Sequence, residues 1–507
     1  MRLLLQLIRT RVLFLVFLLT SIVFQCNSFA KDAEEIDFYH QKISAAEVNH
    51  ILYSLAKDNK WMKLHVIGYS GKNQPILKVS INSSSQTEAK SKIKLMISTG
   101  QHGDEPSGTL AILEFLTKLC QTNNKQLLDN IDFVIIPLVN PDGWDKRTRE
   151  NANGVNINAD YVVLKTPEAR AVVKTLNTES PDVVLDIHES STAKSVLTGK
   201  QGYLTDIVSQ FETSNNANAF EQIQTFSNET LLPAVIKEVF YHGSIAQKYQ
   251  GAIVRLNQPL TGARSTICSL RNYASFHHTI PILLESKKDY QKRRFETPGN
   301  IIQRVKRQRI AISSVLDKLI FYKAGIIALT RTTQVPENNI IARVNYVLND
   351  SQPLKYISLV NIQSGLKEIH EFPNWNKVVS AQIFKRPAGY VVTANEKQIS
   401  QWLILHGIKF YQASNENWPV LSLRLKERQQ VKEAGIGTRL VTILAFNEVK
   451  QQRKLNDKNI IVPLDQPLGI LASLLLDPRS GYGLYETGYD GLTLGQEASI
   501  LPLPQLK

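Results

Sequence analysis

The chain has 507 residues, of which 43% are hydrophobic and 21% are charged, a composition typical of globular proteins rather than disordered or fibrous ones. Its formal net charge of +14 favours anionic surroundings such as nucleic acid, phospholipid or an acidic cell-wall polymer. The basic residues are scattered, however, and their densest runs, at 287–294 and 304–309, are typical of a solvated helix face. Nucleic-acid binding is therefore not expected.

Residues 1–30 have the features of a cleavable export signal. Three arginines precede the apolar run 12–24, and the segment 28–30 places small residues at the two positions that a signal peptidase reads. This apolar run is short for a permanent membrane span. We expect a periplasmic or secreted protein without stable membrane insertion, with a retained membrane anchor as the alternative.

The rest of the chain is longer than one hydrophobic core usually organises, so two domains are expected. Residues 31–325 are predicted to form the larger, catalytic domain. Residues 326–507 contain short alternating segments separated by turn residues, with one helix at 394–406, and predict a smaller β-rich accessory domain. Only Cys120 and Cys268 follow the export signal, too few for a disulfide scaffold, and whether they pair is left open.

In chain order, the larger domain begins with a helix within 35–60 and a strand pair at 64–68 and 76–82. The elements that follow are predicted strands at 94–99, 131–138, 182–187 and 279–284, and predicted helices at 109–120, 167–177, 221–250 and 299–324. This alternation indicates an α/β fold with a mostly parallel or mixed sheet covered by helices on both sides. In such sheets the chemistry collects just past the strand ends.

Candidate metal ligands stand at two of these strand ends. His102 and Glu105 follow the strand 94–99 on a turn with two glycines, and His188 follows the strand 182–187. Two imidazoles and one carboxylate are a ligand set of hydrolytic zinc sites, which leave a fourth position to water. Such sites also need a base to take the proton from that water. Glu285, which ends the strand 279–284, is the predicted general base.

Six segments, in this order, resemble the zinc metallocarboxypeptidase family, as found in exported bacterial members with a C-terminal accessory domain. They are the first hairpin 67–76, the first zinc motif 100–105, the turn 140–143, the substrate-binding segment 149–158, the third-ligand motif 186–189 and the catalytic strand 283–286. The resemblance covers residues 45–320. It implies a mixed eight-stranded sheet between helices, with one zinc ion at the carboxyl edge of the strands.

The resemblance also implies a role for each matching residue. His102, Glu105 and His188 bind zinc, and Glu285 is the base. Arg149 stabilises the oxyanion that forms as water attacks, unless it is an ordinary surface arginine, and Asn158 helps to hold the terminal carboxylate of the substrate.

The sequence departs from the family pattern at three points. Ala159 stands where most members have an arginine that binds the free carboxylate, and a methyl group cannot replace a bidentate guanidinium. Arg264 and Arg271, in the segment before the catalytic strand, are candidates to replace it, with a structural salt bridge or solvent exposure as the alternative. Asn156 replaces an aspartate that supports a zinc-binding histidine, which predicts a weaker metal site. The mobile tyrosine of the family has no counterpart at the expected spacing.

The leading hypothesis is a zinc-dependent peptidase of the carboxypeptidase type. Peptidoglycan stem peptides and peptides with an acidic C-terminal residue are the expected substrate classes. The first alternative is a deacylase of small N-acyl amino acids, and the second is an inactive pseudo-peptidase that only binds peptides. Retention of all three ligands and of Glu285 argues against the pseudo-peptidase. The oligomeric state cannot be derived from the sequence.

Overall fold

The computed structural model describes residues 42–82, 90–122, 124–289, 298–332, 338–432, 440–489 and 491–504. The predicted export signal lies outside these residues. Within them, no helix has both the length and the apolar character that crossing a membrane requires. Cys120 and Cys268 do not form a disulfide with each other.

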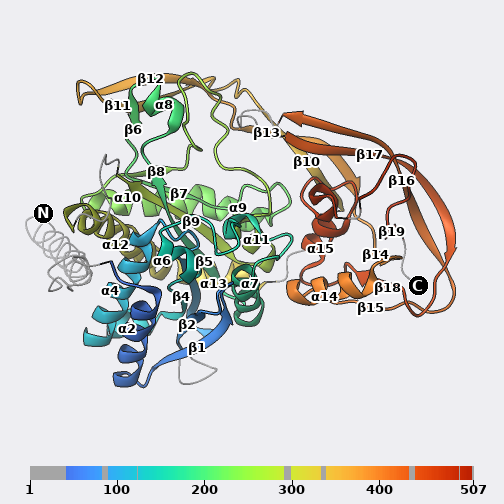
Figure 1. Cartoon of the computed structure of the whole chain (residues 1–507), viewed down its shortest axis with the longest axis horizontal. Helices are drawn as coiled ribbons and strands as arrows, with labels where there is room; N and C mark the ends of the chain where they lie inside the picture. Colours follow the sequence, from blue (N-terminus) through green and yellow to red (C-terminus); the bar gives the residue numbers. More distant parts are fainter. Residues whose placement is uncertain are drawn as a thin grey trace, which may run out of the picture.

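An eight-stranded mixed sheet forms the centre of the larger part (Figure 1). In spatial order its strands are β1 (Met62–Tyr69), β2 (Pro75–Ile81), β4 (Ile131–Ile136), β3 (Ile93–Thr99), β5 (Val183–Ser191), β9 (Ile280–Lys288), β7 (Ser209–Glu212) and β8 (Ala246–Lys248). The middle strands β4, β3, β5 and β9 run parallel, and antiparallel pairs flank them. The predicted α/β class and the mixed eight-stranded sheet are confirmed.

The middle strands are buried on both faces. All six residues of β4 are buried, as expected for near-continuous apolar strands that helices cover on both sides. The packing helices include α2 (Ala45–Asp58), α4 (Pro106–Thr122), α7 (Pro167–Glu179), α10 (Leu232–Tyr241), α11 (Leu270–Ala274) and α12 (Pro298–Phe321). Of these, α4 contacts β5, α12 contacts β9, and α7 contacts β1.

Two predicted helices differ from the observed ones. The segment 221–250 forms α9 (Glu221–Phe226), a π-helical stretch Ser227–Leu231 and α10, but then ends in the edge strand β8. The predicted helix 299–324 is divided into α12 and α13 (Lys323–Arg331). The predicted domain boundary at 325/326 falls inside α13, and the division into two domains stays a prediction.

The C-terminal part is rich in strands, as expected. Its strands are β10 (Asn339–Val347), β11 (Leu354–Asn361), β12 (Lys367–Pro373), β13 (Lys377–Lys385), β14 (Gly389–Val392), β15 (Tyr411–Gln412), β16 (Asn417–Lys432), β17 (Leu440–Lys454), β18 (Ile460–Pro463) and β19 (Ile500–Leu503). Its helices are the predicted one, observed as α14 (Glu396–His406), and α15 (Gly469–Leu476), which the sequence analysis missed.

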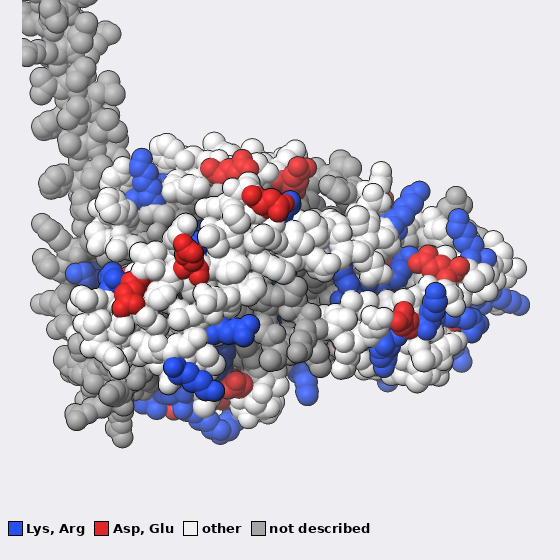
Figure 2. Space-filling view, turned by 90° about the horizontal axis from the view of Figure 1, so that it is seen from above, with Lys and Arg blue, Asp and Glu red and all other residues white. Residues whose placement is uncertain are grey.

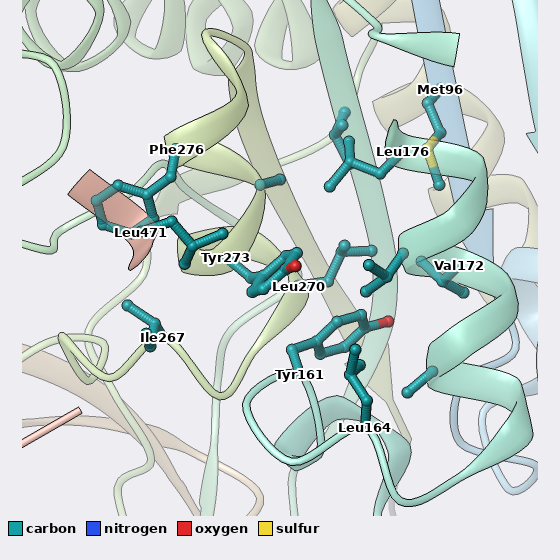
Figure 3. Close-up of a cluster of buried hydrophobic side chains, with 14 of the residues drawn as sticks. Met96, Tyr161, Leu164, Val172, Leu176, Ile267, Leu270, Tyr273, Phe276 and Leu471 are labelled. Carbon is teal, nitrogen blue, oxygen red and sulfur yellow. The ribbon is translucent and has the colours of Figure 1, made fainter. Parts of the chain in front are cut away.

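One apolar core joins the two parts. Figure 3 shows Leu471 of α15 close to Phe276 and Tyr273, which precede β9. The same buried cluster continues through Tyr161 to Val172 on α7. The C-terminal part therefore covers apolar surface of the larger part and is not a loosely tethered appendage.

The C-terminal part also holds the segment 249–271 in place. The short strand β6 (Tyr203–Thr205) pairs with β11, and Leu260 exchanges backbone hydrogen bonds with Pro373 and Trp375. The hydroxyl of Tyr346 accepts a hydrogen bond from the backbone of Ser265 at 3.0 Å. The contacts of Leu260 and Ser265 therefore tie this segment to the C-terminal part.

Surface charge is mixed rather than gathered by sign. On the face shown in Figure 2, lysine and arginine side chains are interspersed with aspartate and glutamate, also at the right end, which the C-terminal part forms. Interspersed charges are typical of a solvated protein surface.

Two histidines, the buried His406 and the partly buried His277, lie near the junction between the parts. His406 donates to the carbonyl of Val162 and accepts from the hydroxyl of Tyr273. Burial lowers the pKa of His406 to about 3 and that of His277 to about 4. Both rings are therefore neutral in the folded protein and take up a proton on unfolding below pH ~6.5, so stability is lost as the pH falls from there.

We expect His406→Gln, which keeps a donor and an acceptor, to weaken this acid sensitivity. Each histidine makes the free energy of unfolding fall by about 1.4 kcal/mol per pH unit below pH ~6.5. The loss between pH 6.5 and 5 is thus expected to be roughly 2 kcal/mol smaller in the variant, measured by urea unfolding at both pH values. Equal losses in variant and wild type would contradict this assignment.

Candidate metal centre and cleft

The structure brings His102, Glu105 and His188 together at the carboxyl ends of β3 and β5. Their ligand atoms all lie within 4.8 Å of one another. His102 Nδ1 lies 2.9 Å from Glu105 Oε1, His188 Nδ1 lies 3.0 Å from Glu105 Oε2, and the two Nδ1 atoms are 3.1 Å apart. Ligands at about 2.1 Å from a tetrahedral zinc ion lie about 3.4 Å apart, so the cluster needs to open only slightly.

Two glycines shape the turn that carries the first two ligands. Gly100 has a φ of +66°, and a Cβ there would lie 2.8 Å from the Leu138 side chain. A Cβ on Gly103 would lie 1.9 Å from the backbone of Gly143. The chain therefore turns sharply after β3, and α4 starts directly after Glu105.

The charges in and around the cluster favour the binding of a cation. Burial alone would raise the pKa of Glu105, yet His102 and His188 hold it well below its ordinary value. Burial would likewise lower the pKa of His188, whereas Asp186 and Glu105 hold it well above its ordinary value. Two ring nitrogens that face each other also need a proton or a cation between them. These three residues could therefore hold zinc.

Both imidazoles are oriented through their Nε2 atoms. His102 Nε2 lies 3.0 Å from Asn156 Oδ1, and His188 Nε2 lies 3.2 Å from Asp186 Oδ1. Asp186 also accepts from Gln101, which accepts from the hydroxyl of Tyr161. Each Nδ1 is thereby directed at the shared centre, an arrangement that supports metal ligation. The sequence analysis assigned no role to Asp186, although it lies two residues before His188 and hence on the same side of β5.

Strand pairing places Glu285 beside the cluster. His188 and Glu285 are direct partners in the parallel pair β5–β9. Burial raises the pKa of Glu285 to about 7, against a lowering effect of His188. A carboxylate of this kind suits proton transfer near neutral pH.

Side chains of helix α12 form hydrogen bonds with residues of both β5 and β9. Arg304 is fully buried and forms two hydrogen bonds with the carboxylate of Glu189, at 2.7 and 2.6 Å. One turn further, Gln308 donates to the backbone of His188 and to the hydroxyl of Ser286. The residues next to the third ligand and next to Glu285 are thus held by one helix.

Arg149 reaches the cluster from the loop after α6 (Pro141–Lys146). Its guanidinium donates to Glu105 Oε1 at 2.9 Å, while its side chain remains 47% exposed. It therefore combines proximity to the metal ligands with access from the cleft.

A cleft of about 790 Å³ opens beside the cluster and contains every predicted substrate-binding residue. Asn158, Arg264, Arg271, Arg149 and Glu285 all line it, as does Ala159. With His188 Nδ1 directed at the metal, its Nε2 carries the proton and donates to Asp186. The amide nitrogen of Asn158, 3.1 Å from the same Nε2, is then free to donate elsewhere.

The two predicted pocket arginines differ in environment. Arg271 is 4% exposed and donates to the carbonyls of Thr213 and Arg264 and to the side chain of Asn215. Its guanidinium is thus largely engaged in fixing the cleft wall. Arg264 is half-buried at the same wall.

Sequence reasoning missed Tyr249. It follows the edge strand β8 and lines the cleft together with Arg149 and Glu285. Burial, and next the carboxylate of Glu285, raises its pKa, so the hydroxyl keeps its proton. The predicted helix 221–250 hid this residue, because Tyr249 was placed inside it. Tyr273, in the segment before β9, is fully buried.

This fold and this site define a class. A mixed eight-stranded sheet carries two histidines and one glutamate, with Glu285 beside them, which is the arrangement that the resemblance to zinc carboxypeptidases implies.

Comparison with known proteins supports this class. The family model described as zinc carboxypeptidase matches residues 48–272, which confirms the resemblance seen in the sequence. The match contains all three candidate ligands and ends before Glu285.

The related proteins are carboxypeptidases. Carboxypeptidase 2 of Trichophyton rubrum is 28% identical over 192 residues, which are 36% of this chain and 35% of the relative. The chain thus spans about a third of the length of this curated relative.

This chain is also similar to solved structures. A metallo-carboxypeptidase from Burkholderia cenocepacia is 16% identical, with a TM-score of 0.43, covering 55% of this chain and 70% of its own. A metallo-carboxypeptidase from Pseudomonas aeruginosa, in complex with (2-guanidinoethylmercapto)succinic acid, is also 16% identical, with a TM-score of 0.42 over 56% and 70%.

We expect Asn156→Asp to strengthen zinc binding, because a carboxylate at this position stabilises the N–H of His102 by charge. Changes at such supporting positions typically alter metal affinity by about 10- to 100-fold. The dissociation constant, measured by competition with a chelator, should fall in Asn156→Asp and rise in Asn156→Ala. Equal affinities in all three proteins would show that Asn156 does not support the ligand.

Proposed function

We propose that this protein is an exported, zinc-dependent peptidase of the carboxypeptidase type. The observation that carries the proposal is the direct pairing of His188 with Glu285, which sets a base beside the ligand cluster. Localisation in the periplasm or outside the cell rests on the features of residues 1–30. The proposed substrates are peptides with an acidic C-terminal residue, including peptidoglycan stem peptides.

The residues around the cluster supply complementary chemistry. Bound zinc would polarise the scissile carbonyl and lower the pKa of a water molecule. Glu285 takes a proton from the attacking water and passes it to the leaving nitrogen. Arg149 donates to the carbonyl oxygen as negative charge develops there. The neutral hydroxyl of Tyr249 offers a further donor at the same wall.

The C-terminal carboxylate of the substrate is bound on the Asn158 side of the cleft. Ala159 leaves this wall without the usual arginine, and Arg271 is engaged by the fold. Arg264 takes over this role, because its backbone carbonyl is fixed by Arg271 and Asn272. The fixed backbone reduces the conformational entropy lost when the guanidinium binds an anion.

The cleft favours a peptide over a small N-acyl amino acid. Its volume of about 790 Å³ lies in the upper part of the range of ~300–1,000 Å³ found for ligand pockets. A protein that only binds peptides would have no use for a base at Glu285.

Glu285→Gln is expected to abolish turnover while zinc binding is retained. The amide keeps the shape of the side chain but cannot accept the proton, a role typically worth about 10²–10⁴-fold in rate. The full-length zinc-loaded protein should be assayed by mass spectrometry on peptidoglycan fragments and acidic dipeptides, and its zinc content measured.

His102→Ala is the matched control and should lose both zinc and turnover. Undiminished hydrolysis by Glu285→Gln would refute the mechanism. Absence of zinc from metal-replete wild type would refute the metal site.

Arg264→Gln is expected to remove the preference for a free C-terminal carboxylate. The ratio of kcat/KM for a free-acid peptide to that for its C-terminal amide should fall about tenfold or more, as charged hydrogen bonds are worth ~1.5–3 kcal/mol. Arg255, which lines the same cleft but is exposed, provides the control Arg255→Gln. A larger effect at Arg255 would assign the carboxylate to that residue instead.

A further inference from the structure

A second, smaller recess lies beside Glu285. It is lined by Lys194, Gln210, Ser190 and Ser286, among others, and shares Gly251, Ala252 and Glu285 with the main cleft. Asn158, Ala159 and Arg264 do not line it. The recess has room for about one water-sized group, ~10 Å³, which is also the size of one carboxylate oxygen.

Gln210 carries an unsatisfied donor in this recess. The residue is 2% exposed, and its Nε2 has no hydrogen-bond partner among the described residues. Gln210 pairs directly with Glu285 across the antiparallel strands β7 and β9, so both side chains lie on the same face of the sheet. A buried donor without a partner is destabilising, and a group that accepts from it is therefore bound favourably.

Lys194 brings an ammonium group without an ion-pair partner among the described residues to the same recess. Lys194 and Lys287 both line the recess, and Lys287 is ion-paired with Asp289. Lys194 makes no ion pair with any carboxylate in the described part of the chain. Burial lowers the pKa of Lys194, and the carboxylate of Glu285 opposes this shift.

We propose that Lys194 and Gln210 form a subsite for a carboxylate on the acyl side of the scissile bond. This inference rests on the proposed peptidase function, which places the leaving C-terminal residue at Asn158 and Arg264. The recess lies at Glu285 away from that wall and receives the residue before the bond. An acidic residue there puts one oxygen between the ammonium of Lys194 and the amide of Gln210.

The test uses the zinc-loaded full-length protein and two peptides that differ only before the scissile bond. One carries N-acetyl-glutamyl and the other N-acetyl-glutaminyl, ahead of the same C-terminal residue. Wild type should prefer the glutamyl peptide by roughly tenfold or more in kcat/KM. Lys194→Met should bring this ratio close to 1.

Lys200→Met is the matched control. Lys194 and Lys200 flank the same short helix α8 (Ser195–Gly199), but Lys200 is exposed and lies outside the recess. The control should keep the preference of wild type. Gln210→Glu, which replaces the donor by a carboxylate next to Lys194, should abolish the preference with an unchanged circular dichroism spectrum. A preference that survives Lys194→Met would overturn the subsite.

Calorimetric binding of both peptides separates this inference from the function on which it rests. Hydrolysis of both peptides at equal rates would refute the subsite and leave the peptidase intact. If neither wild type nor any variant hydrolyses either peptide, the proposed peptidase function is refuted. The subsite would still be upheld if wild type binds the glutamyl peptide more tightly than the glutaminyl peptide and Lys194→Met does not. Equal binding of both peptides would refute the subsite.

Discussion

The parallel pairing of β5 with β9 is the constraint on which the candidate site depends. His188 and Glu285 are neighbours across this pair, so backbone hydrogen bonds of the sheet, rather than flexible loops, set the distance between the candidate ligand and Glu285. A register slip of one residue would turn Glu285 to the other face of the sheet. Helix α12 opposes such a slip, because Gln308 bonds to the backbone of His188 and to Ser286 at once.

The polar groups around this pair are buried, and the carboxylates among them each make more than one polar contact. Glu189 is held by Arg304, which is itself fully buried, and Asp186 lies between His188 and Gln101. Buried charges are tolerated only when they are paired and hydrogen-bonded. The network therefore ties the metal ligands to the core, and a loss at one position would be felt at the others.

Candidate site residues could be predicted from the sequence where they directly follow a continuous apolar segment. Residues 94–99, 182–187 and 279–284 are such segments, and the cluster and Glu285 follow them. The observed strands β5 and β9 continue past His188 and Glu285, so the predicted ends at 187 and 284 were too early. Tyr249 and Gln210 could not be found in this way, because Tyr249 follows the short edge strand β8 and Gln210 lies in the short strand β7, and both strands depend on partners distant in sequence. The helix α15 is apolar all round, so it has no amphipathic period to reveal it. The contacts of 249–271 with the C-terminal part are likewise non-local.

Those contacts have a consequence for the order in which the protein is completed. The loop 249–271 is fixed by Tyr346, which lies 81 and 83 positions after Ser265 and Ala263. A chain synthesised from its N-terminus therefore contains its metal ligands and Glu285 well before the residues that close the cleft. Long-range contacts of this kind also form late in folding. The residues of the candidate metal centre are thereby present in the growing chain before the contacts that fix the wall of the cleft.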